Sequence, residues 1–224
     1  MKPLIIILAL TLTACAAGDG NDGFGPRLKP QASPSDIIAA ELAFARIARE
    51  KGQWTAFRET AAEGAQMFTP QPVLAQQWLK GRADPPVAVA WQPHEVWASA
   101  DGSLAVSYGA WQRPAATGFF VTAWRRQKNG RYKWVLDQGG ALPQPLPAPE
   151  MIQAHVADKP QRGAATIEPC GSHDGNPVVS IISDDQTLEI CTIIMPDTAR
   201  QIGVFMHKGT DRPTVLNLRA APES

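Results

Sequence analysis

Two residues of this sequence, Asp137 and Tyr108, have side chains suited to acid–base chemistry in a pocket. Asp137 ends a predicted strand, where its carboxylate could serve as a general base or as a polar anchor for a ligand; a solvent-facing or loop-capping Asp is the alternative. Tyr108 lies mid-strand, on the face that carries Leu104, Val106 and Ala110, so its hydroxyl could point into a pocket. A partly buried core tyrosine is the alternative there. The two residues are candidates and do not make a complete catalytic set.

Aromatic residues offer a second kind of site, because the sequence contains seven tryptophans. Large rings can line an apolar ligand pocket. The candidates for such a pocket are Trp91 and Trp124, together with Asp137 and Tyr108. The alternative is that the rings fill the core of a curved sheet. His94 and Glu95 are adjacent, so they point to opposite faces of any strand and are poorly placed to form a catalytic dyad.

The sequence lacks the patterns of several common enzymes. It contains no Gly-x-Ser-x-Gly elbow, no P-loop and no dinucleotide fingerprint. Its 21 basic and 21 acidic residues balance without a basic stretch, so we expect no nucleic-acid partner and no patch for anionic lipid headgroups. We expect no cofactor. Whether the chain is an enzyme stays open, with the balance towards a non-catalytic protein.

The first fifteen residues predict export. Lys2 precedes an apolar run over residues 4–12, which is shorter than the roughly 20 residues that cross a bilayer and is typical of a signal peptide. Residues 12–15, Leu-Thr-Ala-Cys, resemble the lipobox of bacterial lipoproteins. That resemblance implies lipidation of Cys15, cleavage before it, and a periplasm-facing anchor in the cell envelope. Ala16, in place of an Asp, favours the outer membrane. An ordinary signal peptide cut elsewhere is the alternative.

The cysteine count follows from this assignment. With Cys15 taken by lipid, Cys170 and Cys191 remain as an even pair in an oxidising compartment, which favours a disulfide between them. The alternative is a metal site formed by these two residues with His173. No fourth ligand is spaced to complete a tetrahedron, so we expect no metal.

The N-terminal part of the predicted fold is helical. Ser33, Pro34 and Asp36 form a helix start, and Gly52 supplies the end of that helix. A second helix follows and ends near Gly64. A short strand is expected around residues 67–68, and a short helix over 73–79.

From residue 87 onwards, apolar residues recur at every second position, which is typical of strands. Strands are predicted at 87–91, 95–99, 104–111, 118–127 and 131–137. An Asp-Gly pair between strands 95–99 and 104–111, and an Asn-Gly pair between strands 118–127 and 131–137, predict hairpin turns. Residues 112–117 are expected to form a longer connection. A Pro-rich boundary at 142–149 precedes a short helix over 150–157. Further strands are then predicted at 178–183, 187–195, 202–207 and 214–218.

The order and spacing of four segments are similar to those of a SnoaL-like domain, in the nuclear-transport-factor-2-like (NTF2-like) superfamily. They are 44–57 (FARIAREKGQWTAF), 91–93 (WQP), 99–111 (SADGSLAVSYGAW) and 118–140 (GFFVTAWRRQKNGRYKWVLDQGG). The resemblance implies an α+β cone, in which N-terminal helices pack in a strongly curved antiparallel sheet with a pocket in the open end. Fold membership fixes no chemistry, because the superfamily holds both enzymes and non-catalytic binders.

Two chemistries known among the relatives do not transfer to these residues. Ketosteroid isomerase places its catalytic Tyr on the N-terminal helices, whereas Tyr108 and Tyr132 of this sequence lie on predicted strands. Scytalone dehydratase needs paired histidines in its pocket, and this domain has only His94. The resemblance therefore implies a fold and a pocket without naming a reaction.

These patterns predict five regions. They are a signal peptide (1–14), a lipidated Cys15 with a flexible tether (15–34), the SnoaL-like domain (35–140), a Pro-rich linker with a short helix (141–163) and a small all-β module (164–220). The predicted function is that of a cell-envelope lipoprotein that binds a small apolar ligand or a protein partner without catalysis. The alternative is an isomerase, cyclase or dehydratase that uses Asp137 and Tyr108.

Overall fold

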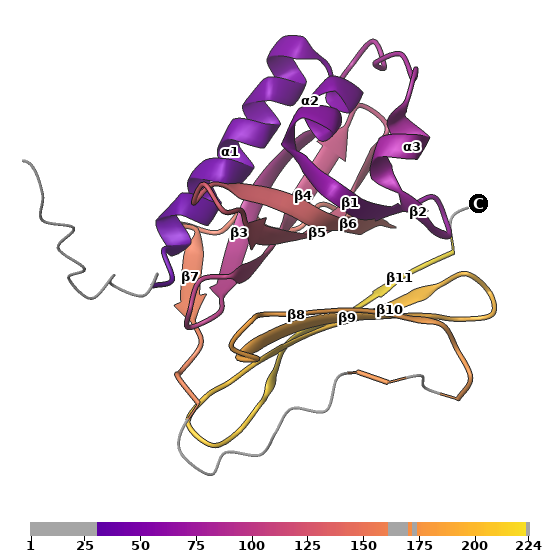
Figure 1. The fold of residues 1–224 in the computed structure, drawn as a ribbon. Coiled ribbons are helices and arrows are strands. Elements are labelled where there is room, and N and C mark those ends of the chain that lie inside the picture. The colour runs from indigo at the N-terminus through magenta and orange to yellow at the C-terminus, as the bar shows by residue number, and fades with distance from the viewer. Residues whose placement is uncertain (1–30, 161–169, 172–173, 223–224) are drawn as a thin grey trace, which may run out of the picture.

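A computed structural model describes residues 31–160, 170–171 and 174–222 (Figure 1). The predicted signal peptide, Cys15, His173 and most of the tether lie outside the described residues. The helices are α1 (Pro34–Lys51), α2 (Gln53–Thr60) and α3 (Ala75–Leu79). The strands are β1 (Ala61–Phe68), β2 (Pro72–Leu74), β3 (Ala90–Ala98), β4 (Leu104–Arg113), β5 (Ala116–Arg126), β6 (Tyr132–Leu142), β7 (Gln153–Val156), β8 (Val178–Ile182), β9 (Leu188–Ile194), β10 (Arg200–Met206) and β11 (Thr214–Ala220).

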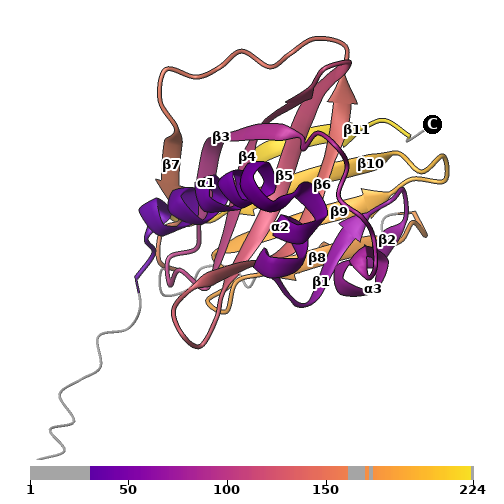
Figure 2. The ribbon, with the colours of Figure 1, turned by 90° about the horizontal axis from the view of Figure 1, so that it is seen from above.

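The elements form three layers, seen from two sides in Figure 1 and Figure 2. The helices cover one face of a curved seven-stranded sheet, ordered β2-β1-β6-β5-β4-β3-β7. A four-stranded sheet, ordered β11-β10-β9-β8, packs against the other face. The chain is therefore α+β, as the sequence predicts. The large sheet is mixed and not antiparallel, because β1 pairs parallel to β6 and β7 pairs parallel to β3.

Helix α1 begins and ends where its sequence predicts. Pro34 lies in the first turn, where its restricted φ suits a helix, although the side chain of Ser33 makes no capping hydrogen bond. Gly52 ends the helix with a φ of 114°, a conformation that favours glycine, and its N–H donates to the carbonyl of Ala48. The buried face of the helix carries Ile37, Glu41, Phe44, Ala45 and Ala48.

The segment after α2 differs from the prediction. Helix α2 ends at Thr60 and does not continue to Gly64, because the following residues form β1 and pair along β6. The predicted helix at 73–79 divides into β2, which pairs with β1, and the shorter α3. Pairing with a sheet outweighs the local helical propensity of these segments, which are rich in helix-favouring residues such as Ala and Gln.

Strands β3 to β6 form an antiparallel meander. Gly102 and Gly130 adopt φ values of 66° and 81° in the predicted Asp-Gly and Asn-Gly turns. The segments 87–91 and 95–99, predicted as two strands, contribute to the single strand β3, which spans only Ala90–Ala98 and has a register shift near Pro93. The connection expected over 112–117 is a tight hairpin, because β4 runs to Arg113 and β5 begins at Ala116.

The predicted helix at 150–157 is wrong, because residues Gln153–Val156 form the strand β7. This strand lies at an edge of the large sheet, in parallel register with β3, and Val96 pairs with Ala154. The four residues gain backbone hydrogen bonds from the sheet, which a helix of this length would supply poorly in water.

The two sheets share one hydrophobic core. It combines residues from the outer face of β3 to β6, among them Val106 and Leu136, with residues of β9 and β10, among them Ile190 and Ile202. The C-terminal strands therefore pack on the large sheet through their apolar face. The second core lies between the helices and the opposite face of the large sheet.

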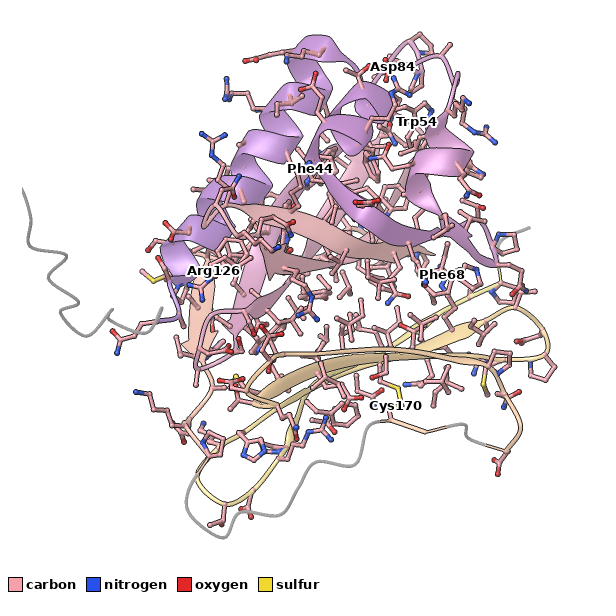
Figure 3. The ribbon with its side chains drawn as sticks, in the orientation of Figure 1. Phe44, Trp54, Phe68, Asp84, Arg126 and Cys170 are labelled. Carbon is pink, nitrogen blue, oxygen red and sulfur yellow. A yellow bond between two sulfur atoms is a disulfide. The ribbon has the colours of Figure 1, made fainter. Side chains whose placement is uncertain are left out.

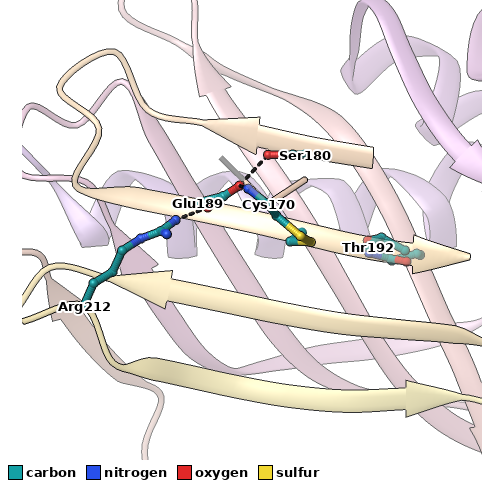
Figure 4. The surroundings of a disulfide bond; sticks show 7 residues. Cys170, Ser180, Glu189, Thr192 and Arg212 are labelled. Atoms are coloured by element: carbon teal, nitrogen blue, oxygen red, sulfur yellow. Dashed lines mark hydrogen bonds and ion pairs between the residues drawn. A yellow bond between two sulfur atoms is a disulfide. The ribbon is translucent and has the colours of Figure 1, made fainter. Parts of the chain in front are cut away.

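Cys170 and Cys191 form a disulfide, as the cysteine count predicts, with Cα atoms 6.0 Å apart (Figure 4). Beside it, the fully buried Glu189 accepts hydrogen bonds from the Cys170 N–H at 2.8 Å and from the Ser180 hydroxyl at 2.5 Å. Glu189 also forms an ion pair with Arg212. Because the disulfide occupies both sulfurs, neither is a thiolate ligand of the alternative metal site.

Removing this disulfide should destabilise the protein. The bond closes a loop of 21 residues, so the double variant Cys170→Ser/Cys191→Ser should lose about 3 kcal/mol of unfolding free energy in the chain-entropy model. Urea unfolding at pH 7 measures the loss, and wild type with reductant should match the variant. Equal stability of the variant and the oxidised wild type would contradict the prediction. Cys15→Ser serves as the matched control.

Within residues 31–160, 170–171 and 174–222, none of the helices has the length and apolar composition that crossing a bilayer requires.

Candidate ligand-binding cavity

A cavity of about 540 Å³ lies between the helices and the inner face of the large sheet. This volume falls within the range of small-molecule sites. Its aromatic lining comes from α1, α2, β3, β4 and β5, and comprises Phe44, Trp54, Phe57, Trp91, Trp111 and Phe120. Figure 3 shows the region between these layers, with Phe44 and Trp54 on the helical side. Trp54, Trp91 and Trp111 therefore line part of a hollow, whereas Trp97, Trp124 and Trp134 are buried in the cores, as the core-filling alternative predicts for them.

Strand alternation places a carboxyl group in this cavity. Asp137 of β6 pairs across the sheet with Thr122 of β5, and both residues line the cavity. The hydroxyl of Thr122 donates to Oδ2 of Asp137 at 2.7 Å. The prediction that Asp137 lies in a pocket agrees with this position, and the solvent-facing alternative does not.

The environment of Asp137 changes its acidity. Burial raises the pKa of its carboxyl from 3.8 to about 7, because an apolar surrounding disfavours the charged form. The hydrogen bond from Thr122 lowers the pKa, and the nearby carboxyl of Glu41 raises it. The side chain lies deep in the molecule while part of its surface still borders the cavity. Asp137 can therefore exchange a proton near neutral pH.

A second carboxyl, that of Glu41 on α1, is fully buried beside the cavity. Its Oε1 accepts a hydrogen bond from the indole N–H of Trp91 at 2.8 Å. Its Oε2 accepts from the hydroxyl of Ser107 at 2.5 Å and from the indole N–H of Trp124 at 3.1 Å. Burial raises the pKa of Glu41, and these three hydrogen bonds lower it. This cluster ties α1 to three strands of the sheet.

Sequence reasoning missed Glu41. The available signal was an acidic residue at helical spacing between Ile37 and Phe44, on the face that the helix buries. A carboxyl in that position must find donors elsewhere in the fold.

The remaining candidates lie elsewhere. Tyr108 faces the core between the two sheets and is absent from the cavity lining, so the partly buried core tyrosine is the correct alternative. Its ring contacts that of His94, with centroids 6.3 Å apart. Trp124 is buried beneath the cavity, where it supports Glu41 without bordering the hollow, whereas Trp91 does both. Trp91 and Asp137 therefore both line the cavity, whereas Tyr108 lies on the other face of the sheet and Trp124 lies next to the cavity without bordering it.

The four-stranded sheet contacts the strand that forms the base of the cavity. The buried guanidinium of Arg200 on β10 donates to the carbonyl oxygen of Gly139 at 2.7 Å. The Gln138 amide donates to the hydroxyl of Thr192 on β9 at 2.7 Å. Gly139 lines the cavity, so β6 presents one face to the cavity and the other to the second sheet.

The part of the chain that the structure describes contains no group of three His, Cys, Asp or Glu residues placed to hold a metal ion.

No protein-family model and no curated protein matches this chain. Three solved structures are similar to about half of it. A protein of unknown function from Pectobacterium atrosepticum is 13% identical, with a TM-score of 0.40, over 49% of this chain and 90% of that one. A candidate ketosteroid isomerase from Parabacteroides distasonis is 14% identical, with a TM-score of 0.40, over 51% and 97%.

An NTF-2-like protein of unknown function from Burkholderia xenovorans is 14% identical, with a TM-score of 0.34, over 52% of this chain and 89% of that one. At these identities the likeness concerns the fold alone. Among these structures, one is described as a ketosteroid isomerase and one as NTF-2-like.

Proposed function

We propose that this protein binds a small, largely apolar molecule in the aromatic cavity, with Asp137 as the polar anchor. One observation carries the proposal: a hollow of about 540 Å³ that aromatic rings surround and that a single carboxyl group borders from the sheet. Apolar walls with a few placed polar groups are typical of small-molecule sites. A cavity of this size and lining fits a small molecule better than it fits a surface of a protein partner.

Filling the cavity tests the proposal. Val89 borders the cavity, whereas Val87, two residues earlier, is 63% exposed and does not border it. Val89→Trp should weaken binding of a neutral naphthalene fluorophore at least about tenfold, which corresponds to about 1.4 kcal/mol. Val87→Trp is the matched control and should leave the affinity unchanged. Fluorescence titration measures both, and equal affinities for the two variants would refute binding in the cavity.

A second function, an acid–base enzyme of the isomerase, cyclase or dehydratase type, has one observation in its favour. The pKa of Asp137, raised to about 7, suits a group that accepts and returns a proton at neutral pH. Native mass spectrometry of the purified full chain would identify a bound molecule. A change in its mass or isomeric form during incubation with wild type, absent with Asp137→Asn, would favour the enzyme over the binding protein.

We also propose that the cavity acts in the cell envelope, on a chain anchored through lipid on Cys15 to the outer membrane. The lipobox-like residues 12–15 support this location. Cys15→Ser should abolish incorporation of labelled palmitate and release the protein from membranes, because the variant lacks the sulfur that takes the lipid. Membrane fractionation with the label measures both effects. Retention of the unlabelled variant on membranes would contradict the lipid anchor.

In the proposed division of the chain, residues 35–140 form the ligand-binding domain and residues 164–220 form a supporting module. The contacts of Arg200 and Thr192 with β6 support this role for the module. They tie the base of the cavity to the second sheet, so ordering of that sheet assists ordering of the binding site.

A further inference from the structure

We propose that the cavity takes an organic ammonium ion, that is, an amine with an apolar or aromatic body whose N–H groups donate to the free oxygen of Asp137. This inference rests on the proposed binding function and specifies the chemical class of the ligand. The geometry of the carboxyl group, the aromatic lining and the surrounding charges each contribute to it.

The first argument is the unused oxygen of Asp137. Its Oδ2 accepts the hydrogen bond from Thr122, and among the described residues no protein group donates to Oδ1. Asp137 borders the cavity, so a bound molecule can reach this oxygen. An ionised carboxylate only accepts hydrogen bonds, whereas an ammonium group only donates them. The ligand must therefore bring the donor, and a charged donor forms the stronger hydrogen bond.

The second argument is the aromatic wall. Phe44 lies 4.8 Å from Phe57 and 4.8 Å from Trp91, measured between ring centroids, and Trp54 continues the row at 5.5 Å from Phe57. All four rings line the cavity. The faces of aromatic rings attract cations, and Trp does so most strongly. A ligand that places its charge over the face of one of these rings therefore gains from the walls as well as from the carboxyl group.

The third argument concerns the charges that face Asp137. From α1 comes the carboxyl of Glu41, which adds negative charge on the helical side. Arg113, at the end of β4, borders the cavity but is exposed, so solvent and salt screen it. Arg200 lies on the other side of the sheet, and its N–H groups bond to the carbonyls of Gly139 and Pro70. Together these groups favour a cation over an anion at Asp137.

The release of protons on binding, and the resulting pH dependence of the affinity, provide a measurable test of the inference. Burial keeps the carboxyl of Asp137 partly neutral near pH 7 in the empty cavity. A bound cation stabilises the ionised carboxylate, so binding should release protons and strengthen as the pH rises through 7. A neutral ligand gains no such stabilisation.

Three naphthalene probes of matched size test the proposal: 1-naphthylmethylamine, 1-naphthalenemethanol and 1-naphthoate. Isothermal titration at pH 8 should show the amine binding at least about tenfold more tightly than the alcohol, with naphthoate weakest. Between pH 8 and pH 6 the affinity for the amine should fall by up to about tenfold, following the ionised fraction of a group whose pKa is about 7. The alcohol should change little.

Asp137→Asn should abolish the preference for the amine, and Glu63→Gln, on an exposed position of β1, is the control that should retain it. Equal or tighter binding of the alcohol to wild type at pH 8 would overturn the inference and leave the proposed function standing. A preference for the amine that survives in Asp137→Asn would also overturn it. If none of the three probes binds and Val89→Trp does not weaken fluorophore binding, the proposed function fails as well. The comparison of amine and alcohol in wild type does not depend on folding of any variant.

Discussion

Asp137→Asn should make the protein more stable than wild type at pH 8, and the difference should shrink towards pH 5. The pKa of Asp137 is about 7 in the folded protein and near its ordinary value of 3.8 when the chain is unfolded. Between these values the folded state binds more protons, so stability falls as the pH rises through the window. The asparagine cannot ionise and escapes this loss. The stability gap should therefore grow by about 2–3 kcal/mol from pH 5 to pH 8.

Urea unfolding of both proteins at pH 5, 6, 7 and 8 measures this gap. The exposed carboxyl of Glu63 provides a matched substitution, and Glu63→Gln should track wild type across the series. A stability difference between Asp137→Asn and wild type that stays constant with pH would show that folding does not raise the pKa of Asp137 to about 7. A salt series separates burial from surface charge effects, because screening acts weakly on buried groups.

Glu41→Ala should cause a large loss of stability. The substitution removes an acceptor of Trp91, Ser107 and Trp124. The Trp91 N–H is left without its acceptor, whereas Trp124 keeps the Ser107 hydroxyl at 3.0 Å and Ser107 can donate to the Thr122 carbonyl at 3.4 Å. The unpaired donor costs about 1–3 kcal/mol, and the space left by the fully buried side chain adds a cavity cost of similar size, so the total loss should be on the order of 4 kcal/mol. Differential scanning calorimetry and urea unfolding at pH 7 measure it. Naphthalene binding should weaken in the same variant, because the Trp91 ring loses the bond that holds it at the cavity wall.

Glu41→Gln is the matched control and should cost less than about 2 kcal/mol, because the amide keeps an oxygen acceptor in the same shape. The hydroxyl of Ser107 can accept from the new NH₂ group and donate instead to the Thr122 carbonyl, which lies 3.4 Å away. Glu41→Gln should also lower the pKa of Asp137, since the Glu41 carboxyl raises it. Equal stability of the Ala and Gln variants would refute the role of Glu41 as an acceptor.

Local patterns were sufficient to predict much of the large sheet. The alternation in β4 to β6 and the turns at Gly102 and Gly130 depend on neighbours in sequence, and the structure has them. The position of Asp137 at the end of a predicted strand indicated a side chain that could enter a pocket, and Asp137 lines the cavity. Alternation placed Tyr108 on one face with Leu104 and Val106, but it could not tell which face would meet the helices and which the second sheet.

The rest of the fold and site depends on partners far apart in the chain. Glu41 becomes an acceptor through donors 50, 66 and 83 residues away, and no local pattern signals them. Residues Gln153–Val156 become a strand only because β3 offers them an edge. The parallel pairing of β1 with β6 has the same origin, since a segment that contains Ala and Gln has no strong strand propensity of its own.

The position of the tryptophans has an optical consequence. Trp54, Trp91 and Trp111 border the cavity, so water that enters the empty hollow can reach these three indoles. A ligand that displaces that water should shift their fluorescence emission to shorter wavelength, whereas the buried Trp124 and Trp134 should respond little. The intrinsic tryptophan fluorescence of the unlabelled protein therefore reports whether the cavity is occupied. Emission spectra alone can screen compounds before the ligand of the cavity is identified.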